Sequence, residues 1–210
     1  MSLETDLLID RRRLKRGLAL WRVVAILAVF AAAAVALRDS GPARTLLGAH
    51  VARLAVTGLI TEDRERDQAL RDLARDGRAR ALIVAIDSPG GTVAGGEALH
   101  RALAEVARAK PVVAVMGGTA ASAGYMIALP AQRIFAREAT VTGSIGVIMQ
   151  TVEFSGLMER LGISAQAITG GSLKDEPSPF RPLSPEGRAA LAAVVQDLHG
   201  QFIAMVAEGR

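Results

Sequence analysis

Apolar positions along the chain form one long run near the N-terminus and then several short runs separated by polar segments. The run at residues 51–56 alternates and is β-rich, which predicts a strand, and the continuous apolar runs at 81–86 and 111–116 are typical of strands buried on both faces. Between them, residues 62–76 and 96–109 place apolar side chains at helical spacing. Strands that alternate with helices predict an α/β domain with a mostly parallel sheet.

The pattern beyond residue 116 predicts further strands and helices. Ser184 and Pro185 stand where the N-cap and first position of a last helix are expected. The expected elements are an alanine-rich helix at 120–129, short strands at 133–136, 147–149 and 165–168, and a final helix at 185–208.

The long apolar run covers residues 18–37 and contains one charge, Arg22, near its start. A helix of roughly 20 apolar residues is long enough to cross a bilayer, so we expect a transmembrane anchor that contacts lipid. The basic residues before the run predict that the N-terminus lies in the cytoplasm and that the chain after the run is exported, to the periplasm or another extracytoplasmic space. A cleavable signal peptide is the alternative, because Ala34-Val35-Ala36 resembles a cleavage site.

These features divide the chain into four expected parts. They are a basic cytoplasmic N-terminus (1–17), an anchor in the cell membrane (18–37), a linker (38–50) and one α/β domain (51–210).

The positive charge of the chain lies mostly in front of the anchor. The formal net charge is +4, and residues 1–22 hold six basic against three acidic side chains, which accounts for +3 of it. Aromatic residues make up only 3% of the chain, so bases would find little to stack on. We therefore expect no nucleic-acid partner. The chain has no cysteine and no H-E-x-x-H motif, and we expect neither a metal nor a cofactor.

Ser122 is the candidate nucleophile. It follows a buried run and lies among very small residues at positions 117–125. A serine at a strand-to-helix junction can face solvent at a helix N-terminus, where backbone N–H groups favour a developing oxyanion. A serine that merely caps the helix would look the same, so the local sequence leaves both interpretations open.

The glycine pair in residues 86–91 (IDSPGG) also stands between a strand and a helix. Its spacing is not that of a nucleotide-binding loop. Two adjacent glycines leave backbone N–H groups uncovered, as an oxyanion hole requires, although a tight turn would use the same residues.

A serine nucleophile needs a base. None of the histidines, which are His50, His100 and His199, lies in a glycine-rich or polar loop. Beyond the anchor the only lysines are Lys110 and Lys174, and lysine, unlike arginine, can lose its proton when its pKa is lowered. Lys174 follows the run 165–168 in a glycine-rich loop and can accept the Ser122 proton if it is sheltered, whereas an exposed Lys174 would be an ordinary loop lysine.

Taken together, these motifs resemble the signal peptide peptidase A family, membrane-anchored serine-lysine proteases with the Clp-protease/crotonase fold of repeated β-β-α units. The matching stretches follow the family's order from residue 51 to the end. They are 86–91 (IDSPGG), 110–116 (KPVVAVM), 120–125 (AASAGY), 142–148 (TGSIGVI), 171–175 with Ser178-Pro179-Phe180, and 202–210 (FIAMVAEGR).

The resemblance implies a role for each candidate residue. It implies Ser122 as nucleophile, Lys174 as general base and Ser144 as the residue that orients the lysine amine. It implies the N–H groups of Gly91 and Ala123 as the oxyanion hole. Substrates would be remnant signal peptides and other exported peptides, bound in extended form beside strands near Thr92, Val93, Val147 and Ile148.

Members of the family form homo-oligomeric rings, in which serine and lysine can come from neighbouring copies. Two departures stand out, since Ala123 replaces a usual glycine and the sequence stops at Gly209-Arg210, where relatives continue. A catalytically inactive membrane scaffold and a crotonase-type acyl-CoA enzyme are the alternatives. Labelling of Ser122 by a serine-directed probe separates them from a protease.

Overall fold

We describe the protein from a computed structural model, in which residues 20–32 and 48–210 are described. The chain divides into two units, Met1–Gly48 and Ala49–Arg210. In the first unit, Leu20–Ala32 forms an exposed apolar helix. That helix is shorter than the roughly 20 residues that cross a bilayer, and the rest of the predicted anchor lies outside the described residues. The basic N-terminus and most of the linker also lie outside them.

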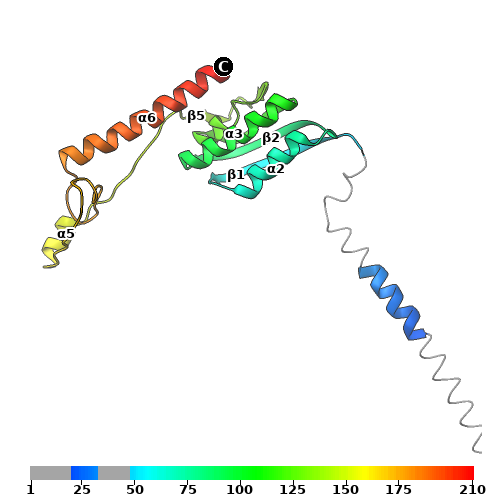
Figure 1. The fold of residues 1–210 in the computed structure, drawn as a ribbon, viewed down its shortest axis with the longest axis horizontal. Coiled ribbons are helices and arrows are strands. Elements are labelled where there is room, and N and C mark those ends of the chain that lie inside the picture. The colour runs from blue at the N-terminus through cyan, green and yellow to red at the C-terminus, as the bar shows by residue number, and fades with distance from the viewer. Residues whose placement is uncertain (1–19, 33–47) are drawn as a thin grey trace, which may run out of the picture. The chain divides into compact units, whose positions relative to one another are not determined.

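The second unit is built on a parallel sheet, as predicted (Figure 1). The strand order is β1-β2-β3-β4, and β5 pairs with the end of β3. The elements in chain order are β1 (His50–Ile60), α2 (Arg64–Arg75), β2 (Ala79–Gly91), α3 (Val93–Ala109), β3 (Val112–Ala121), α4 (Ala123–Met126), β4 (Arg133–Phe135), β5 (Val141–Gly143), α5 (Ser155–Arg160) and α6 (Pro185–Gly209). Among these elements, the order β-β-α occurs only in β4, β5 and α5, so the repetition that the resemblance implies is not seen in the described part of the chain.

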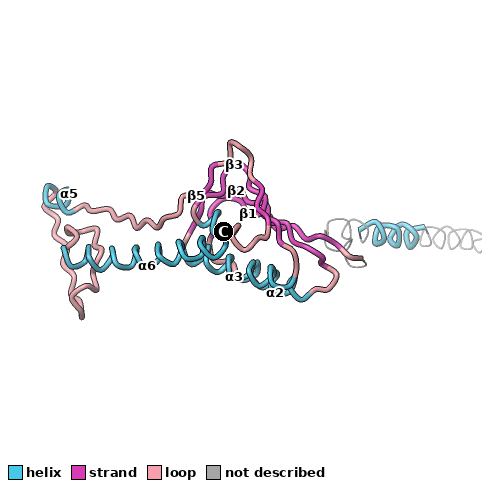
Figure 2. Tube along the Cα trace, turned by 90° about the horizontal axis from the view of Figure 1, so that it is seen from above, coloured by secondary structure: helices cyan, strands magenta, loops and turns pink. Residues whose placement is uncertain are grey.

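Helices α2 and α3 lie on one side of the sheet (Figure 2). The hydrophobic core lies between these helices and the sheet. Its buried side chains include Leu82, Val84 and Ile86 of β2 and Leu99, Leu103 and Val106 of α3. The other face of the sheet is open, since Phe135 is 59% exposed and Val51 and Val115 are also exposed. The prediction of a strand buried on both faces is therefore wrong for β3 within this unit, whereas β1 is exposed on one face.

The ends of α2 and α3 are fixed by polar groups. Asp63 caps α2 by accepting the Arg66 N–H at 3.0 Å. At the other end of α2, the ammonium group of Lys110 donates to the carbonyl oxygens of Leu73, Asp76 and Ala79 at 2.5, 2.8 and 3.0 Å. Lys110 therefore joins the end of α3 to the end of α2 and the start of β2.

The alanine-rich segment at 120–129 is mostly not helical. β3 continues to Ala121 because its last residues pair with β5, and α4 then lasts only four residues. Alanine favours helices by intrinsic propensity and is depleted in strands, so the pairing of β3 with β5 overrides the local preference here.

The segment between β5 and α6 extends away from the sheet. The predicted strands at 147–149 and 165–168 are not formed, and Ile168 is fully exposed at 103%. A strand needs a neighbour to satisfy its backbone hydrogen bonds, and the described chain provides none at these positions. Both views show that α5 and the first turns of α6 lie far from the sheet (Figures 1 and 2).

The final helix α6 agrees with the prediction, including the Ser184 cap, whose hydroxyl accepts the Gly187 N–H at 2.9 Å. Its C-terminal half joins the body through Phe202, which is 2% exposed and packs with Met126 and Leu129. By length and apolar composition, α6 is the helix among the described residues that is long enough to cross a membrane. Because α6 packs on α4, we describe it as part of the domain.

Candidate active site

Ser122 lies at the junction of β3 and α4 in an unusual backbone conformation. Its φ and ψ angles are 52° and −121°, which L-residues rarely adopt and which concentrate at functional sites. Its N–H donates to the Gly143 oxygen at 2.8 Å, and its carbonyl oxygen accepts the N–H groups of Tyr125 and Met126, both at 2.9 Å. Neighbouring strand and helix thus hold the strained residue in place.

The side chain of Ser122 does not cap the helix that it precedes. Among the described residues its hydroxyl makes no capping hydrogen bond to α4, and the side chain is half-buried. The alternative of a plain N-cap serine therefore does not fit the structure. The hydroxyl group therefore lies at the N-terminus of α4 without stabilising the helix by a capping hydrogen bond.

Gly90 lies directly against this serine. A methyl group added at Gly90 would stand 2.9 Å from Ser122 Cβ and 3.3 Å from Ser122 Oγ. Gly90 also has a φ of 121°, a conformation that favours glycine. Its neighbour Gly91 packs on the backbone of Ile60, where an added Cβ would stand only 1.9 Å from the Ile60 oxygen. The glycine pair therefore lets the backbone approach the serine more closely than any side chain would allow.

Ser144 is brought beside Ser122 by strand pairing. The register pairs Ala121 with Gly143, so the two serines directly follow paired residues at the ends of β3 and β5. Both have a φ of 52°. The predicted nucleophile and the predicted lysine-orienting serine are therefore neighbours in one chain.

Ala123 is buried and forms the first residue of α4. The first N–H groups of a helix have no acceptor within the helix, so the Ala123 N–H is one of the donors that α4 leaves available. Its methyl group packs against Gly96 of α3, where an added Cβ would stand 2.9 Å from Ala123 Cβ. The space left by Gly96 explains how this chain accommodates alanine here.

Lys174 lies in the segment that extends away from the sheet. Its side chain is exposed, and its N–H donates to the Gly171 oxygen at 3.3 Å within a turn. The turn precedes the N-terminus of α6, whereas α6 meets the body at Phe202. At 1.5 Å per residue, the length of helix between these two points is about 25 Å. Within one chain, the segment before α6 that carries Lys174 therefore lies far from the sheet whose strand β3 leads to Ser122 (Figures 1 and 2).

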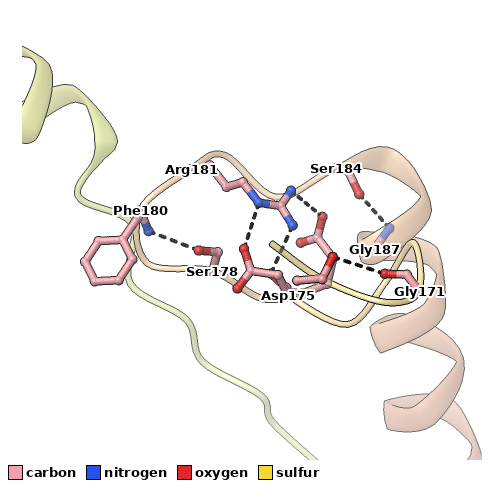
Figure 3. A network of polar contacts seen from close by, with 9 residues as sticks. Gly171, Asp175, Ser178, Phe180, Arg181, Ser184 and Gly187 are labelled. Carbon is pink, nitrogen blue, oxygen red and sulfur yellow. Dashed lines mark hydrogen bonds and ion pairs between the residues drawn. The ribbon is translucent and has the colours of Figure 1, made fainter. Parts of the chain in front are cut away.

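An ion-pair network shapes the turn that carries Lys174 (Figure 3). The guanidinium group of Arg181 donates to Asp175 Oδ2 at 3.1 Å, to the Asp175 backbone oxygen at 3.0 Å and to Glu176 Oε1 at 2.9 Å. A hydrogen bond with Ser184 and the adjacent Arg181 charge lower the pKa of Glu176. The turn is thus fixed to the N-terminus of α6.

Comparison with known proteins identifies the family. The model of peptidase family S49 matches residues 104–210, a stretch that includes Ser122, Ser144 and Lys174. The chain belongs to peptidase family S49. This confirms the resemblance to signal peptide peptidase A.

Two relatives and one solved structure illustrate the relationship. The protein slr0021 of Synechocystis is 38% identical over 171 residues, which are 80% of this chain and 61% of that protein. A protein of Enterococcus faecium whose name assigns it as signal peptide peptidase SppA is 31% identical over 174 residues, 76% of this chain and 51% of its own. ClpP1 from Listeria monocytogenes has a TM-score of 0.34 at 26% identity, covering 38% of this chain and 46% of that chain.

This S49 chain spans about half the length of the curated relatives that it matches, with shares of 45%, 61% and 51% for three of them.

The other residues predicted to bind substrate have mixed surroundings in this S49 chain. Thr92 and Val93 directly follow the end of β2: Thr92 caps α3 and donates its N–H to the Ile60 oxygen, and Val93 is the first residue of α3. Binding of an extended substrate beside this end of β2 stays a prediction. Val147 and Ile148 line a pocket of about 590 Å³ against α6, and Ser122 is not among the residues that line it.

His100 of this S49 chain lies on α3 beside a pocket of about 430 Å³ whose lining includes Leu129 and Glu208 but not Ser122. Its Nδ1 atom is buried and has no hydrogen-bond partner among the described residues, and burial lowers the pKa of the His100 imidazole. Within residues 20–32 and 48–210, no cluster of three or more His, Asp or Glu side chains could hold a metal ion.

The sequence analysis did not predict the individual roles of two residues in the 86–91 motif, Gly90 and Ser88. The motif Ser-Pro-Gly-Gly was visible, but hydrophobic periodicity does not tell which glycine faces the serine. Ser88 is buried beneath this glycine, and nothing in the pattern separates it from an ordinary turn serine.

Proposed function

We propose that this protein is a membrane-anchored serine endopeptidase in which Ser122 is the nucleophile. The observation that carries the proposal is that Ser122 has a strained backbone, does not cap α4 with its side chain, and lies against the glycine pair at the end of β2. Ser122 Oγ attacks a peptide carbonyl and forms an ester with the acyl half of the substrate, while the amine half leaves. Water then attacks the ester and frees the serine. The N–H groups of Gly91 and Ala123 stabilise the oxyanion of both tetrahedral intermediates.

The base in this proposal is Lys174 from a neighbouring copy of the chain. A neutral Lys174 amine takes the proton from Ser122 Oγ and passes it to the departing amine of the substrate. In the second step it takes a proton from the attacking water and returns it to Ser122 Oγ as the ester bond breaks. Ser144 stands next to Ser122 and orients the incoming amine by a hydrogen bond. Lys174 belongs to the segment between β5 and α6, which extends away from the sheet (Figure 1), and this supports pairing between copies rather than within one.

Assembly into a homo-oligomeric ring is part of the same proposal. The extended segment exposes many apolar side chains, including Ile148, Leu161 and Ile168. Exposed apolar surface of this extent is characteristic of protein interfaces. Neighbouring copies in a ring would cover it and bring each Lys174 toward the Ser122 of the next copy. We also propose the Clp-protease/crotonase fold for the complete domain, as the resemblance implies.

Substrates are proposed to be remnant signal peptides and other exported peptides, with small apolar side chains at the cleavage site. They would lie in extended form beside Val147 and Ile148, which have no strand partner in the described chain. An anchor at residues 18–37 would hold the domain at the extracytoplasmic face of the cell membrane, with the N-terminus in the cytoplasm. The exposed apolar helix Leu20–Ala32 supports this placement.

Active-site labelling tests the proposal. The full chain, purified in detergent, is treated with a fluorescent fluorophosphonate, and the modified residue is located by mass spectrometry. We expect labelling of Ser122 in the wild type, none in Ser122→Ala, and labelling slowed by about 100-fold or more in Lys174→Ala, the usual scale for loss of a general base. Modification of other serines with equal labelling of Ser122→Ala would refute the nucleophile, and an unaffected rate in Lys174→Ala would refute the base.

A further inference from the structure

Ser88 is a polar residue buried completely in the core, with 0% of its surface exposed. A buried hydroxyl group is costly unless it is hydrogen-bonded. Ser88 Oγ lies 2.6 Å from the Gly58 oxygen and 3.2 Å from the Gly90 oxygen, and it accepts the Gly90 N–H at 3.1 Å. Since a hydroxyl group has one hydrogen to donate, the shorter contact identifies Gly58 as the acceptor. Ser88 thus links the end of β1 to the Gly90 backbone.

The location of this link is unusual in the sheet. The pairing of β1 with β2 shifts register between Thr57 and Leu59, and the pairing of β2 with β3 shifts between Ile86 and Ser88. At such bulges some backbone groups lose their ladder partners. The Ser88 side chain supplies partners for Gly58 and Gly90 at the point where both ladders are irregular.

The same residue also touches the helix that follows the nucleophile. A Cβ atom added at Gly124 would stand 2.8 Å from the Ser88 carbonyl oxygen, so the first turn of α4 packs on Ser88. Gly90, which Ser88 holds, lies against Ser122 itself. Ser88 is therefore in contact with both parts of the proposed oxyanion hole, the glycine pair and the start of α4.

We propose that Ser88 is a positioning residue of the active site. Its hydroxyl group binds the Gly90 N–H, which fixes the orientation of the next peptide unit and leaves the Gly91 N–H as the donor of the glycine pair to the oxyanion. This inference rests on the proposed function, in which Ser122 is the nucleophile. Ser88 touches neither substrate nor reacting atoms and acts only through Gly90 and α4.

The structure predicts how the loss of this hydroxyl group should act. A misdirected Gly91 N–H weakens the bond to the oxyanion, which exists only in the transition state and the tetrahedral intermediates, so kcat should fall while KM stays nearly constant. Complete loss of one oxyanion donor costs about 100- to 1,000-fold in kcat, and a donor that is misaligned rather than removed should cost about 10- to 100-fold.

The experiment measures kcat and KM of the full chain on a fluorogenic peptide with alanine around the cleaved bond. It also measures the inhibition constant of the matching peptide aldehyde, which forms a tetrahedral adduct. In Ser88→Ala we expect kcat to fall 10- to 100-fold, KM to change less than about twofold, and aldehyde affinity to fall by the same factor as kcat. Ser88→Cys keeps the shape of the side chain with a larger terminal atom and accepts hydrogen bonds only weakly, and it should show the same split if Ser88→Ala does not fold.

Asp63→Ala is the matched control, because it removes a side-chain acceptor of one backbone N–H at the start of α2, in a contact that includes neither Gly90 nor α4. It should lower stability without changing kcat. Wild-type kcat and aldehyde affinity in a folded Ser88 variant would overturn the inference, and so would a loss confined to stability or to KM. If the wild type itself fails to react with fluorophosphonate at Ser122, the proposed function fails instead, and the two results are read separately.

Discussion

Replacement of Gly90 by alanine perturbs the candidate site through a single methyl group. Two effects add at this position. The φ of 121° is unfavourable for any residue with a Cβ atom, which costs about 1–3 kcal/mol. The new Cβ would also stand 2.9 Å from Ser122 Cβ and 3.2 Å from the Ala121 oxygen, and overpacking of this kind costs about 1–3 kcal/mol. We therefore expect Gly90→Ala to destabilise the domain by about 2–6 kcal/mol.

The same methyl group should displace the nucleophile. Relief of the contact with Ser122 Cβ from 2.9 Å to an ordinary 3.4 Å requires a movement of 0.5 Å. A misplacement of about 1 Å at a reactive centre can cost 100-fold in rate, so half of that predicts a loss of about tenfold in fluorophosphonate labelling. Labelling is measured under conditions where circular dichroism shows that the variant is folded.

Two other glycines separate these effects. Gly162 has a φ of 69° but open space around it, so Gly162→Ala should cost only about 1–2 kcal/mol for the backbone conformation and leave labelling unchanged. Gly77 has neither a positive φ nor a neighbour within 4 Å, and Gly77→Ala should be close to neutral. Urea unfolding of the three variants should therefore show the largest loss of stability for Gly90→Ala, a smaller loss for Gly162→Ala and the smallest for Gly77→Ala. If Gly90→Ala matched Gly162→Ala in both stability and labelling, the packing of Gly90 on Ser122 would be wrong.

Three further predictions concern the framework around the site. Lys110→Met keeps the alkyl chain but removes the ammonium group from its three carbonyl partners, and urea unfolding should show a loss of about 2–3 kcal/mol; less than about 0.5 would contradict that role. Phe202→Ala should cost about 3–4 kcal/mol and make the connection before α6 sensitive to protease, whereas an unchanged digestion pattern would show that α6 is held elsewhere. Burial lowers the pKa of His100 in the folded protein, so the unfolded chain binds a proton at this side chain more tightly than the folded chain does. The free energy of unfolding should therefore be highest above about pH 6.5, where His100 is neutral in both states, and should fall as the pH is lowered below that value. His100→Gln should remove that part of the pH dependence of the urea midpoint, and an identical pH profile would count against it.

The body of the fold was predictable because its segments are locally consistent. The apolar runs that became β1, β2 and β3 alternate with amphipathic stretches that became α2 and α3, and each helix begins at an oxygen-bearing cap, Asp63 or Thr92. Local propensity, periodicity and capping agree in this part of the chain.

The segment between β5 and α6 shows where a single-chain pattern fails. Val147, Ile148 and Ile168 have the apolar, β-branched character of strands, yet they form none in the described chain. Sequence pattern records that a side chain suits burial or pairing, but not which partner provides it. If the partner is another copy, the pattern is correct and one chain cannot display it.

The site was predictable in its residue types but not in its geometry. Small residues around Ser122 indicated an approachable serine, and the pairing of β3 with β5 then placed Ser144 beside it. The roles of Gly90 and Ser88 depend on a positive φ and two register shifts, which arise from tertiary packing and leave no periodic signal. Lys174 was identified by being one of two lysines in the body, but no local feature of the sequence gives its distance from Ser122.

The most direct test of the central claim, that Ser122 and Lys174 of different copies form one active site, is to mix two inactive variants. Ser122→Ala and Lys174→Ala chains are co-expressed in equal amounts, and hydrolysis of the fluorogenic peptide is compared with each variant alone. Random mixing at one kind of interface pairs an intact serine with an intact lysine in about one quarter of sites, so we predict about a quarter of wild-type activity. Activity no greater than that of the separate variants would contradict a site shared between copies.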